Sequence, residues 1–301
     1  MLLTAVAIIG IGIWLAAPRT LLWLQFWRER LRVRARVQRV TLADGEVVYL
    51  KAGHGTGVPV LYVHGFTGMK ENWLPLMAGI GRAQMQYAPD LPGWGDSERR
   101  AGLDYGYAAQ ADRLLEFIDR IIGGPVDLVG HSMGGGIAAV LAARYPGKVR
   151  RLGLLDAAGV RFADNTFGQA VLDGHNPFGV TDVASLQRYL ALVLERPPWV
   201  PQRLARWMVR RRIADTGFEQ SVLDRIGRGP DAFLPEREAS AITLPTLLLW
   251  CRNDRVVDPS AAAIYAAIIP DSRIVLVDGS GHMPMLESTA ATVAALKEFL
   301  R

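Results

Sequence analysis

Residues 130–134 read Gly-His-Ser-Met-Gly and fit the pattern G-x-S-x-G. The apolar run at residues 126–129 is typical of a buried parallel strand, and the alanine-rich residues 137–144 indicate a helix. Ser132 is therefore predicted on a sharp turn from strand to helix. Such a turn requires small neighbours and holds the hydroxyl exposed above the sheet. A glycine-rich turn with an incidental serine is the alternative, and the flanking strand and helix patterns disfavour it.

A base and an orienting acid are needed downstream, because a serine hydroxyl is a poor nucleophile at neutral pH. Residues 247–251 read as a late buried strand, and Asp254 lies on the loop after it. Residues 274–277 read as another strand, followed by His282. The order Ser, Asp, His is the one expected after a strand-to-helix elbow. We assign Ser132 as nucleophile, His282 as general base and then acid, and Asp254 as the group that fixes the imidazole tautomer.

Two other carboxylates compete with Asp254 for the orienting role. Asp258 follows it closely in the chain, and Asp156 ends the apolar run at residues 152–155, where an acid is also topologically possible. We prefer Asp254 because it falls directly on the loop at the strand end.

The other histidines give no second catalytic centre. His131 is next to Ser132, and we expect its side chain to point away from the serine. His54 and His175 lie in glycine-rich or turn-like sequence and are expected to be solvated. The sequence has no metal-ligand pattern, because it contains one cysteine, no His-x-x-x-His pair and no carboxylate cluster of the ligand type. We therefore expect neither a metal nor an organic cofactor.

Acyl transfer also requires donors for the developing oxyanion. Residues 60–63 predict a strand, and the loop after it, residues 64–68, is placed to supply one backbone N–H. The candidate donors are the amides of Phe66 and Met133, while His64 is expected to hold the loop. A second loop near the site, residues 90–97, is rich in Gly and Pro, and we expect its aspartates to brace it.

In this order the motifs resemble the α/β-hydrolase family over residues 36–301. The motifs are His64-Gly65-Phe66, Asp90-Leu91-Pro92-Gly93-Trp94-Gly95, Gly130-His131-Ser132-Met133-Gly134-Gly135, Asp254 and Gly281-His282. Two further segments, Met69-Lys70-Glu71-Asn72-Trp73 and Ala158-Gly159-Val160, make the chain similar to membrane-bound monoacylglycerol lipases and related bacterial lipases. Epoxide hydrolases and haloalkane dehalogenases share this fold but carry aspartate at the position of Ser132.

The resemblance implies an eight-stranded, mostly parallel sheet with helices on both faces and a helical lid after the sixth strand. The sequence independently supports an insertion, because strand patterning disappears over residues 161–240 and amphipathic helices are predicted at residues 182–194 and 201–212. We therefore expect core segments at residues 28–160 and 241–301. The insertion is rich in aromatic residues, which as a set favour an apolar substrate: Phe162, Phe167, Phe178, Trp199, Trp207, Phe218 and Phe233.

The N-terminal segment predicts a membrane anchor at residues 1–27. Residues 1–17 carry no charged side chain, and residues 21–27 are again largely apolar after Pro18-Arg19. As one helix this stretch would be roughly 40 Å long, enough for a ~30 Å hydrocarbon core. A cleaved signal peptide is the alternative, but no Lys or Arg precedes the apolar run and Pro18 is a poor cleavage context.

The basic character of the chain is confined to its start. Residues 1–40 hold seven arginines and one glutamate, a balance of +6, and the remainder of the chain holds 27 basic and 28 acidic residues, a balance of −1. This distribution argues against a nucleic-acid surface on the catalytic domain and favours contact with anionic lipid headgroups. The positive-inside rule then predicts a single-pass membrane protein with its catalytic domain on the cytoplasmic side. The single Cys251 makes no case for export to an oxidising compartment.

These features together predict a membrane-anchored serine hydrolase that cleaves monoacylglycerols or similar lipid esters through an acyl-enzyme. The same three side chains also serve C–C bond hydrolases, thioesterases and acyltransferases, which remain alternatives. A catalytically inactive binding protein on the same fold is the alternative from a different class.

Overall fold

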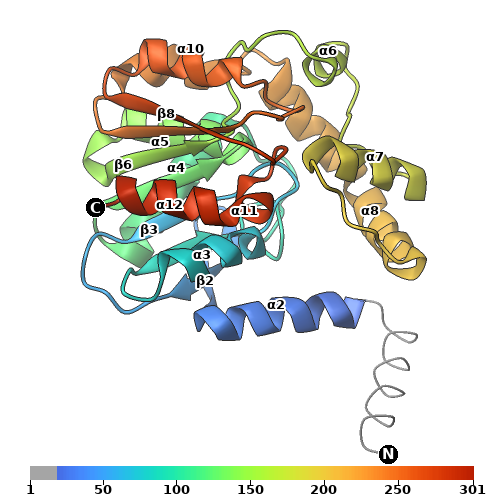
Figure 1. Cartoon of the computed structure of the whole chain (residues 1–301), viewed down its shortest axis with the longest axis horizontal. Coiled ribbons are helices and arrows are strands. Elements are labelled where there is room, and N and C mark those ends of the chain that lie inside the picture. The colour runs from blue at the N-terminus through green and yellow to red at the C-terminus, as the bar shows by residue number, and fades with distance from the viewer. Residues whose placement is uncertain (1–18) are drawn as a thin grey trace, which may run out of the picture.

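The computed structural model describes residues 19–301 and is built around one eight-stranded sheet (Figure 1). The strand order across it is β1-β2-β4-β3-β5-β6-β7-β8. β2 pairs antiparallel with both β1 and β4, and every other pairing is parallel. The strands are β1 (Arg36–Leu42), β2 (Gly45–Ala52), β3 (Val60–Val63), β4 (Gln86–Pro89), β5 (Val126–His131), β6 (Val149–Leu155), β7 (Thr246–Cys251) and β8 (Ser272–Val277). The predicted sheet is confirmed.

Helices cover both faces of the sheet. α3 (Leu74–Ile80) and α12 (Thr289–Phe299) pack against each other on one face, and α4 (Tyr107–Phe117), α5 (Met133–Arg144) and α10 (Ser260–Ile268) lie on the other. Short elements complete the layers: η1 (Lys70–Trp73), η2 (Ile118–Ile122), η3 (Pro146–Lys148), η4 (Ala239–Ala241) and α11 (Pro284–Glu287).

The central strands read as continuous apolar runs because both of their faces are covered. All residues of β3, β5 and β7 are buried, whereas β8 lies at the sheet edge and leaves Ile274 and Leu276 exposed. Parallel strands end at a common edge, so the loops after β3, β5 and β7 come together there. These loops carry Phe66, Ser132 and Asp254, and the loop after the neighbouring parallel strand β8 carries His282.

A helical insertion connects β6 to β7. It comprises α6 (Thr166–Leu172), α7 (Val183–Val193), α8 (Gln202–Gly227) and α9 (Leu234–Glu238), of which α6, α7 and α8 stand beside the sheet in Figure 1. α7 agrees with the helix predicted at residues 182–194, and Asp182 caps it by accepting a hydrogen bond from Ser185 N at 2.7 Å. α8 runs far beyond the helix predicted at residues 201–212, because its second half buries Val222, Leu223 and Ile226, and Val222 and Ile226 pack into the core on the side of α4 and α5.

The first described element, α2 (Arg19–Val33), corrects a prediction at the start of the core. The alternation of apolar residues and arginines over residues 31–40 predicts a first strand that begins almost directly after the anchor segment. Instead Val33 ends a helix that packs on α3, and Val33 is buried there. The chain turns at Arg34, with φ 54°, before β1 starts. The predicted boundary after residue 27 falls inside this helix.

The predicted anchor lies mostly outside the described residues, which begin at residue 19. Among the helices of residues 19–301, none is both long and apolar enough to cross a membrane.

Candidate active site

Ser132 occupies a strained turn between β5 and α5. Its φ of 53° and ψ of −122° lie where residues with a side chain are rarely found. Its N–H donates to Leu155 O and its carbonyl accepts from Ala158 N, each at 3.0 Å, so β6 and the loop after it hold the turn. A Cβ on Gly134 would lie 2.3 Å from Val63 O, so only glycine lets the helix start this close to β3.

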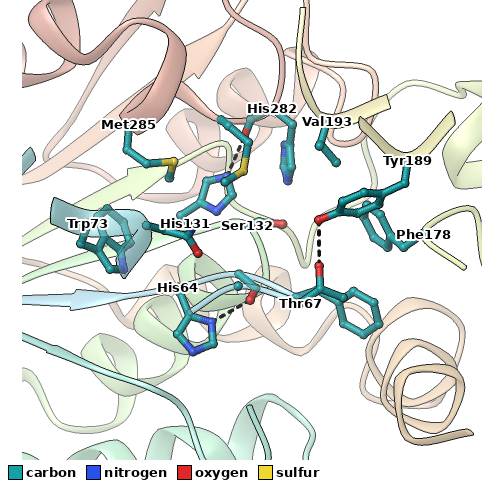
Figure 2. Close-up of a pocket in the computed structure, with 15 residues that line it drawn as sticks. His64, Thr67, Trp73, His131, Ser132, Phe178, Tyr189, Val193, His282 and Met285 are labelled. Atoms are coloured by element: carbon teal, nitrogen blue, oxygen red, sulfur yellow. Dashed lines mark hydrogen bonds between the residues drawn. The ribbon is translucent and has the colours of Figure 1, made fainter. Parts of the chain in front are cut away.

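His282 pairs with Asp254 at the same edge of the sheet. Nδ1 of His282 lies 2.7 Å from Asp254 Oδ2, and both residues are buried. The other oxygen, Oδ1, accepts from Val256 N at 2.8 Å and Val257 N at 3.1 Å, which fixes the carboxylate. His282 Nε2 is buried and has no hydrogen-bond partner within residues 19–301, and it belongs to the same cavity wall as Ser132 (Figure 2). The arrangement leaves Nε2 available to a proton.

The two competing carboxylates have other partners. Asp258 accepts from Ser260 N at 2.9 Å at the start of α10. Asp156 is fully buried and accepts from Cys251 N at 2.8 Å. Burial, together with the negative charge of Asp254 and a hydrogen bond with it, raises the pKa of Asp156 well above its ordinary value. The raised pKa favours the neutral form of the Asp156 carboxyl group.

His131 is buried, and its side chain contacts the backbone of the loop that carries His282. Its ring packs against that of His282, with centroids 4.7 Å apart, and its Nε2 lies 2.7 Å from the His282 carbonyl oxygen. Since a carbonyl can only accept, Nε2 carries the proton. Burial, with the nearby charge of His282, lowers the pKa of His131 well below its ordinary value, which keeps the ring neutral. This partner of His131 was not predicted from the sequence. His54 and His175 are exposed.

The loop after β3 approaches Ser132 closely. A Cβ on Gly65 would lie 2.9 Å from Ser132 Cβ. His64 accepts from Leu91 N on Nε2 at 2.9 Å, so its neutral ring carries the proton on Nδ1, which donates to Gly65 O at 2.8 Å. Within residues 19–301, the backbone N–H groups of Phe66 and Met133 have no acceptor among the hydrogen bonds described.

Ser132 lies where two cavities of different character meet. The larger one, of about 390 Å³, is mostly apolar and is walled by Phe162, Phe167, Leu223, Ile226 and Val257 among others. The smaller one, of about 50 Å³, is lined by more polar groups, including Thr67, Asn72, Tyr189 and His282. Thr67 and Tyr189 are hydrogen-bonded across it at 3.1 Å (Figure 2), which links the loop after β3 to α7. No local sequence signal identified Tyr189.

The aromatic residues of the insertion divide into two groups. Phe162, Phe167, Phe178 and Phe233 line the larger cavity. The other three do not line it: Phe218 packs on Trp94, with ring centroids 5.0 Å apart, the Trp207 ring lies 5.9 Å from the Arg211 guanidinium, and Trp199 is exposed. The expectation of an apolar wall therefore applies to the first group.

Comparison with known proteins agrees with this geometry. The sequence profile described as the alpha/beta hydrolase fold matches residues 58–289. The chain belongs to the α/β-hydrolase family. This hydrolase is 30% identical over 278 residues to lipase 3 of Moraxella sp. (strain TA144), an alignment that covers 90% of this chain and 86% of the relative. It is 27% identical over 294 residues to a monoacylglycerol lipase of Bos taurus, with coverage of 94% and 87%.

Among solved structures, this hydrolase resembles one described as a membrane phospholipase A, a bacterial virulence factor. The TM-score is 0.88 at 32% identity, and the match covers 99% of this chain and 96% of the other. The family and its lipase relatives identify the protein as an ester hydrolase. 

Proposed function

We propose that this hydrolase cleaves lipid esters with one long acyl chain, such as monoacylglycerols, through an acyl-enzyme on Ser132. The observation that carries the proposal is the position of Ser132 between a large, mostly apolar cavity and a small cavity with a larger share of polar groups, beside the paired His282 and Asp254. The names of the lipase and monoacylglycerol lipase relatives support the same substrate class.

The chemistry follows from the positions of these groups. Ser132 Oγ attacks the ester carbonyl while His282 Nε2 takes its proton, and Asp254 stabilises the imidazolium that results. The N–H groups of Phe66 and Met133 donate hydrogen bonds to the carbonyl oxygen and stabilise the negative charge that develops on it. His282 then gives its proton to the leaving alcohol, and a water activated by the same ring hydrolyses the acyl-enzyme.

The two cavities assign the two halves of the substrate. An acyl chain gains free energy by leaving water for the larger cavity, at about 0.8 kcal/mol for each buried CH₂. A hydrophilic alcohol such as glycerol fits the smaller cavity, where Thr67, Asn72 and Tyr189 offer hydrogen-bonding groups. 

Residues 161–240 act in this proposal as a lid over the site. α7 contributes Tyr189, which bonds Thr67, and Val193, whose carbonyl accepts from His282 N at 2.9 Å. Both contacts join the insertion to loops that carry candidate catalytic groups. The lid thereby closes the smaller cavity on one side.

The test is hydrolysis of a series of monoacylglycerols, from short to long chains, by the detergent-solubilised protein. Ser132→Ala is the blank, and active sites are counted with a fluorophosphonate. We expect turnover that depends on Ser132 and rises with chain length. Labelling of Ser132 without turnover on any ester would overturn the ester substrate and direct the search to C–C, thioester or acyl-transfer chemistry. Neither labelling nor turnover would indicate an inactive binding protein.

Membrane anchoring through residues 1–27 is part of the proposal, with the catalytic domain on the cytoplasmic side. In the described part of this segment, α2 presents Trp23, Leu24 and Trp27 to solvent, and Leu31 continues the same exposed apolar face. Tryptophan is suited to the membrane interface, and the neighbouring arginines to anionic headgroups.

Anchoring is tested by carbonate extraction of membranes from cells that express the full chain or a chain without residues 1–18. The deletion leaves α2 complete. We expect the full chain to resist extraction and the shortened chain to be released. Release of the full chain by carbonate contradicts the anchor, whichever ester the protein cleaves.

A further inference from the structure

A cluster of charges, all buried except the half-exposed Asp96, lies next to the loop that carries Phe66. Lys70, at the start of η1, is only 1% exposed, and its Nζ lies 2.7 Å from Asp90 Oδ2, 2.6 Å from Asp96 Oδ2 and 3.3 Å from Glu71 Oε1. Burial lowers the pKa of Lys70, but the carboxylates around it outweigh this effect and raise the pKa above its ordinary value. Charges buried in this way require all their partners in place, because losing one leaves another uncompensated.

Asp90 connects this cluster to the loop after β3. Its carboxylate also accepts from the backbone N–H of Lys70 at 2.6 Å and of Asp96 at 2.8 Å. Leu91, the next residue, donates its N–H to His64. Trp94 of the same segment packs its ring against Phe66, with centroids 5.0 Å apart. The position of residues 64–66, and with it the Phe66 amide, therefore depends on where Asp90 is held.

Glu71 connects the cluster to α2. Its Oε1, which already contacts Lys70, accepts from Arg30 Nη2 at 2.9 Å. The Glu71 and Arg30 side chains are 4% and 14% exposed, so water screens this pair weakly. The Arg30 guanidinium also lies 5.3 Å from the ring of Trp23, which belongs to the exposed apolar face of the helix.

We propose that Arg30, Glu71 and Lys70 are positioning residues that connect helix α2 to the loop after β3, residues 64–68, which carries the Phe66 amide. Turnover then depends on α2 being packed in its place on α3. The inference rests on the proposed roles of Ser132 and the Phe66 amide. The path runs from Arg30 to Glu71 and Lys70, then through Asp90 and Leu91 to His64. None of the three positioning residues lines either cavity beside Ser132.

The experiment compares Arg30→Gln, Glu71→Gln and the double variant in the full-length, detergent-solubilised protein. kcat and KM for p-nitrophenyl butyrate are measured per fluorophosphonate-titrated site, together with Tm. We expect kcat to fall about tenfold in each single variant with KM nearly unchanged, because a displaced oxyanion donor weakens the transition state alone. The double variant should be no slower than the slower single variant, since both changes break one path.

Two further variants separate positioning from general stability. Arg28→Gln removes a charge from an exposed residue of the same helix and should leave kcat unchanged. Arg30→Lys keeps the positive charge and should recover most of the loss. The rate of Ser132 phosphonylation should fall with kcat, because the phosphoryl oxygen uses the same donors.

An unchanged kcat in both single variants would overturn the inference. So would a lower Tm with normal turnover and phosphonylation per titrated site, which would indicate a purely structural cluster. If the wild type itself shows no turnover that depends on Ser132, the proposed function fails instead, and the two failures are thereby distinguished.

Discussion

At the scale of single residues, two neighbouring buried carboxyl groups lie in different environments. Asp254 accepts two backbone N–H groups and faces His282, whereas Asp156 faces Cys251 and has a raised pKa. Burial and a neighbouring like charge favour the neutral form of a carboxyl group, and they raise the pKa of Asp156. These environments favour Asp254, rather than Asp156, as the group that orients His282.

Asparagine at each position tests this division. Asp254→Asn should lower kcat by about 10³-fold or more with the fold retained, because His282 loses its charged partner and its tautomer is no longer fixed. Asp156→Asn should keep kcat within a few-fold of the wild type, since it replaces one neutral group by another that can still accept from Cys251 N. Steady-state kinetics on a soluble ester, with Tm as the folding control, measure both. Equal losses would show that the acid role is shared.

His131 predicts a pH dependence of stability. Its pKa is lowered from the usual 6.5 in the folded state, so the unfolded chain binds a proton there first as the pH falls. The contribution of neutral His131 to the free energy of unfolding is therefore complete above about pH 6.5. It is lost as the pH falls below that value, by up to about 1.4 kcal/mol per pH unit. In His131→Gln, which keeps a donor for the His282 carbonyl, the free energy of unfolding should depend less steeply on pH. Urea denaturation between about pH 7.5 and pH 5.0 measures this, and identical slopes would contradict it.

At the scale of elements, the elbow depends on how closely α5 approaches β3. A Cβ at Gly134 would lie 2.3 Å from Val63 O and 2.4 Å from His64 O, and neither backbone group can yield without moving its strand end. Elsewhere in a helix, alanine is usually the better residue. The steric demand of the elbow reverses that preference.

Gly134→Ala should therefore destabilise the protein by about 3 kcal/mol or more. Gly147→Ala is the matched control, because a Cβ there meets nothing within 4 Å, and its effect should stay within about 0.5 kcal/mol. The measurement is the midpoint of urea unfolding for each variant. A Gly134→Ala protein as stable as the control would mean that the helix start can shift freely.

At the scale of the whole molecule, the larger cavity exists only because the insertion closes over the core. α5 and the loops after β3 and β6 form one wall, and α6 and α8 form the other. The length of this cavity limits the length of the acyl chain that it can hold. A residue of α8 that lines the cavity offers a position for changing that limit.

Ile226→Trp should shorten the preferred acyl chain. Ile226 lines the cavity from α8, so a larger side chain occupies space that a long chain requires. We expect kcat/KM to fall about tenfold on a long-chain monoacylglycerol relative to a short one. Ile213→Trp, which is 48% exposed on the same helix, should leave the ratio unchanged. An unaltered ratio in Ile226→Trp would place the acyl chain elsewhere.

Predictions from sequence were most successful where an element depends on its own residues. The strand at residues 126–129, the turn at Ser132 and the following helix were located because glycine spacing and apolar runs act locally. The prediction failed at residues 31–33, where packing of Val33 on α3 extends a helix into an apparent strand. Tertiary packing also extends α8 beyond residue 212, in this case through the burial of Val222, Leu223 and Ile226.

The sequence by itself determined the family, the eight-stranded and mostly parallel sheet implied by it, and the chain order of Ser132, Asp254 and His282, because these follow from local patterns and their order along the chain. Tertiary structure decided which carboxylate faces His282, where His131 donates its proton, and that Lys70 pairs with Asp90 and Asp96 of a distant loop as well as with Glu71. Such choices depend on distances between residues far apart in the chain. Burial then sets their charge, and neither distance nor burial is encoded at any one position.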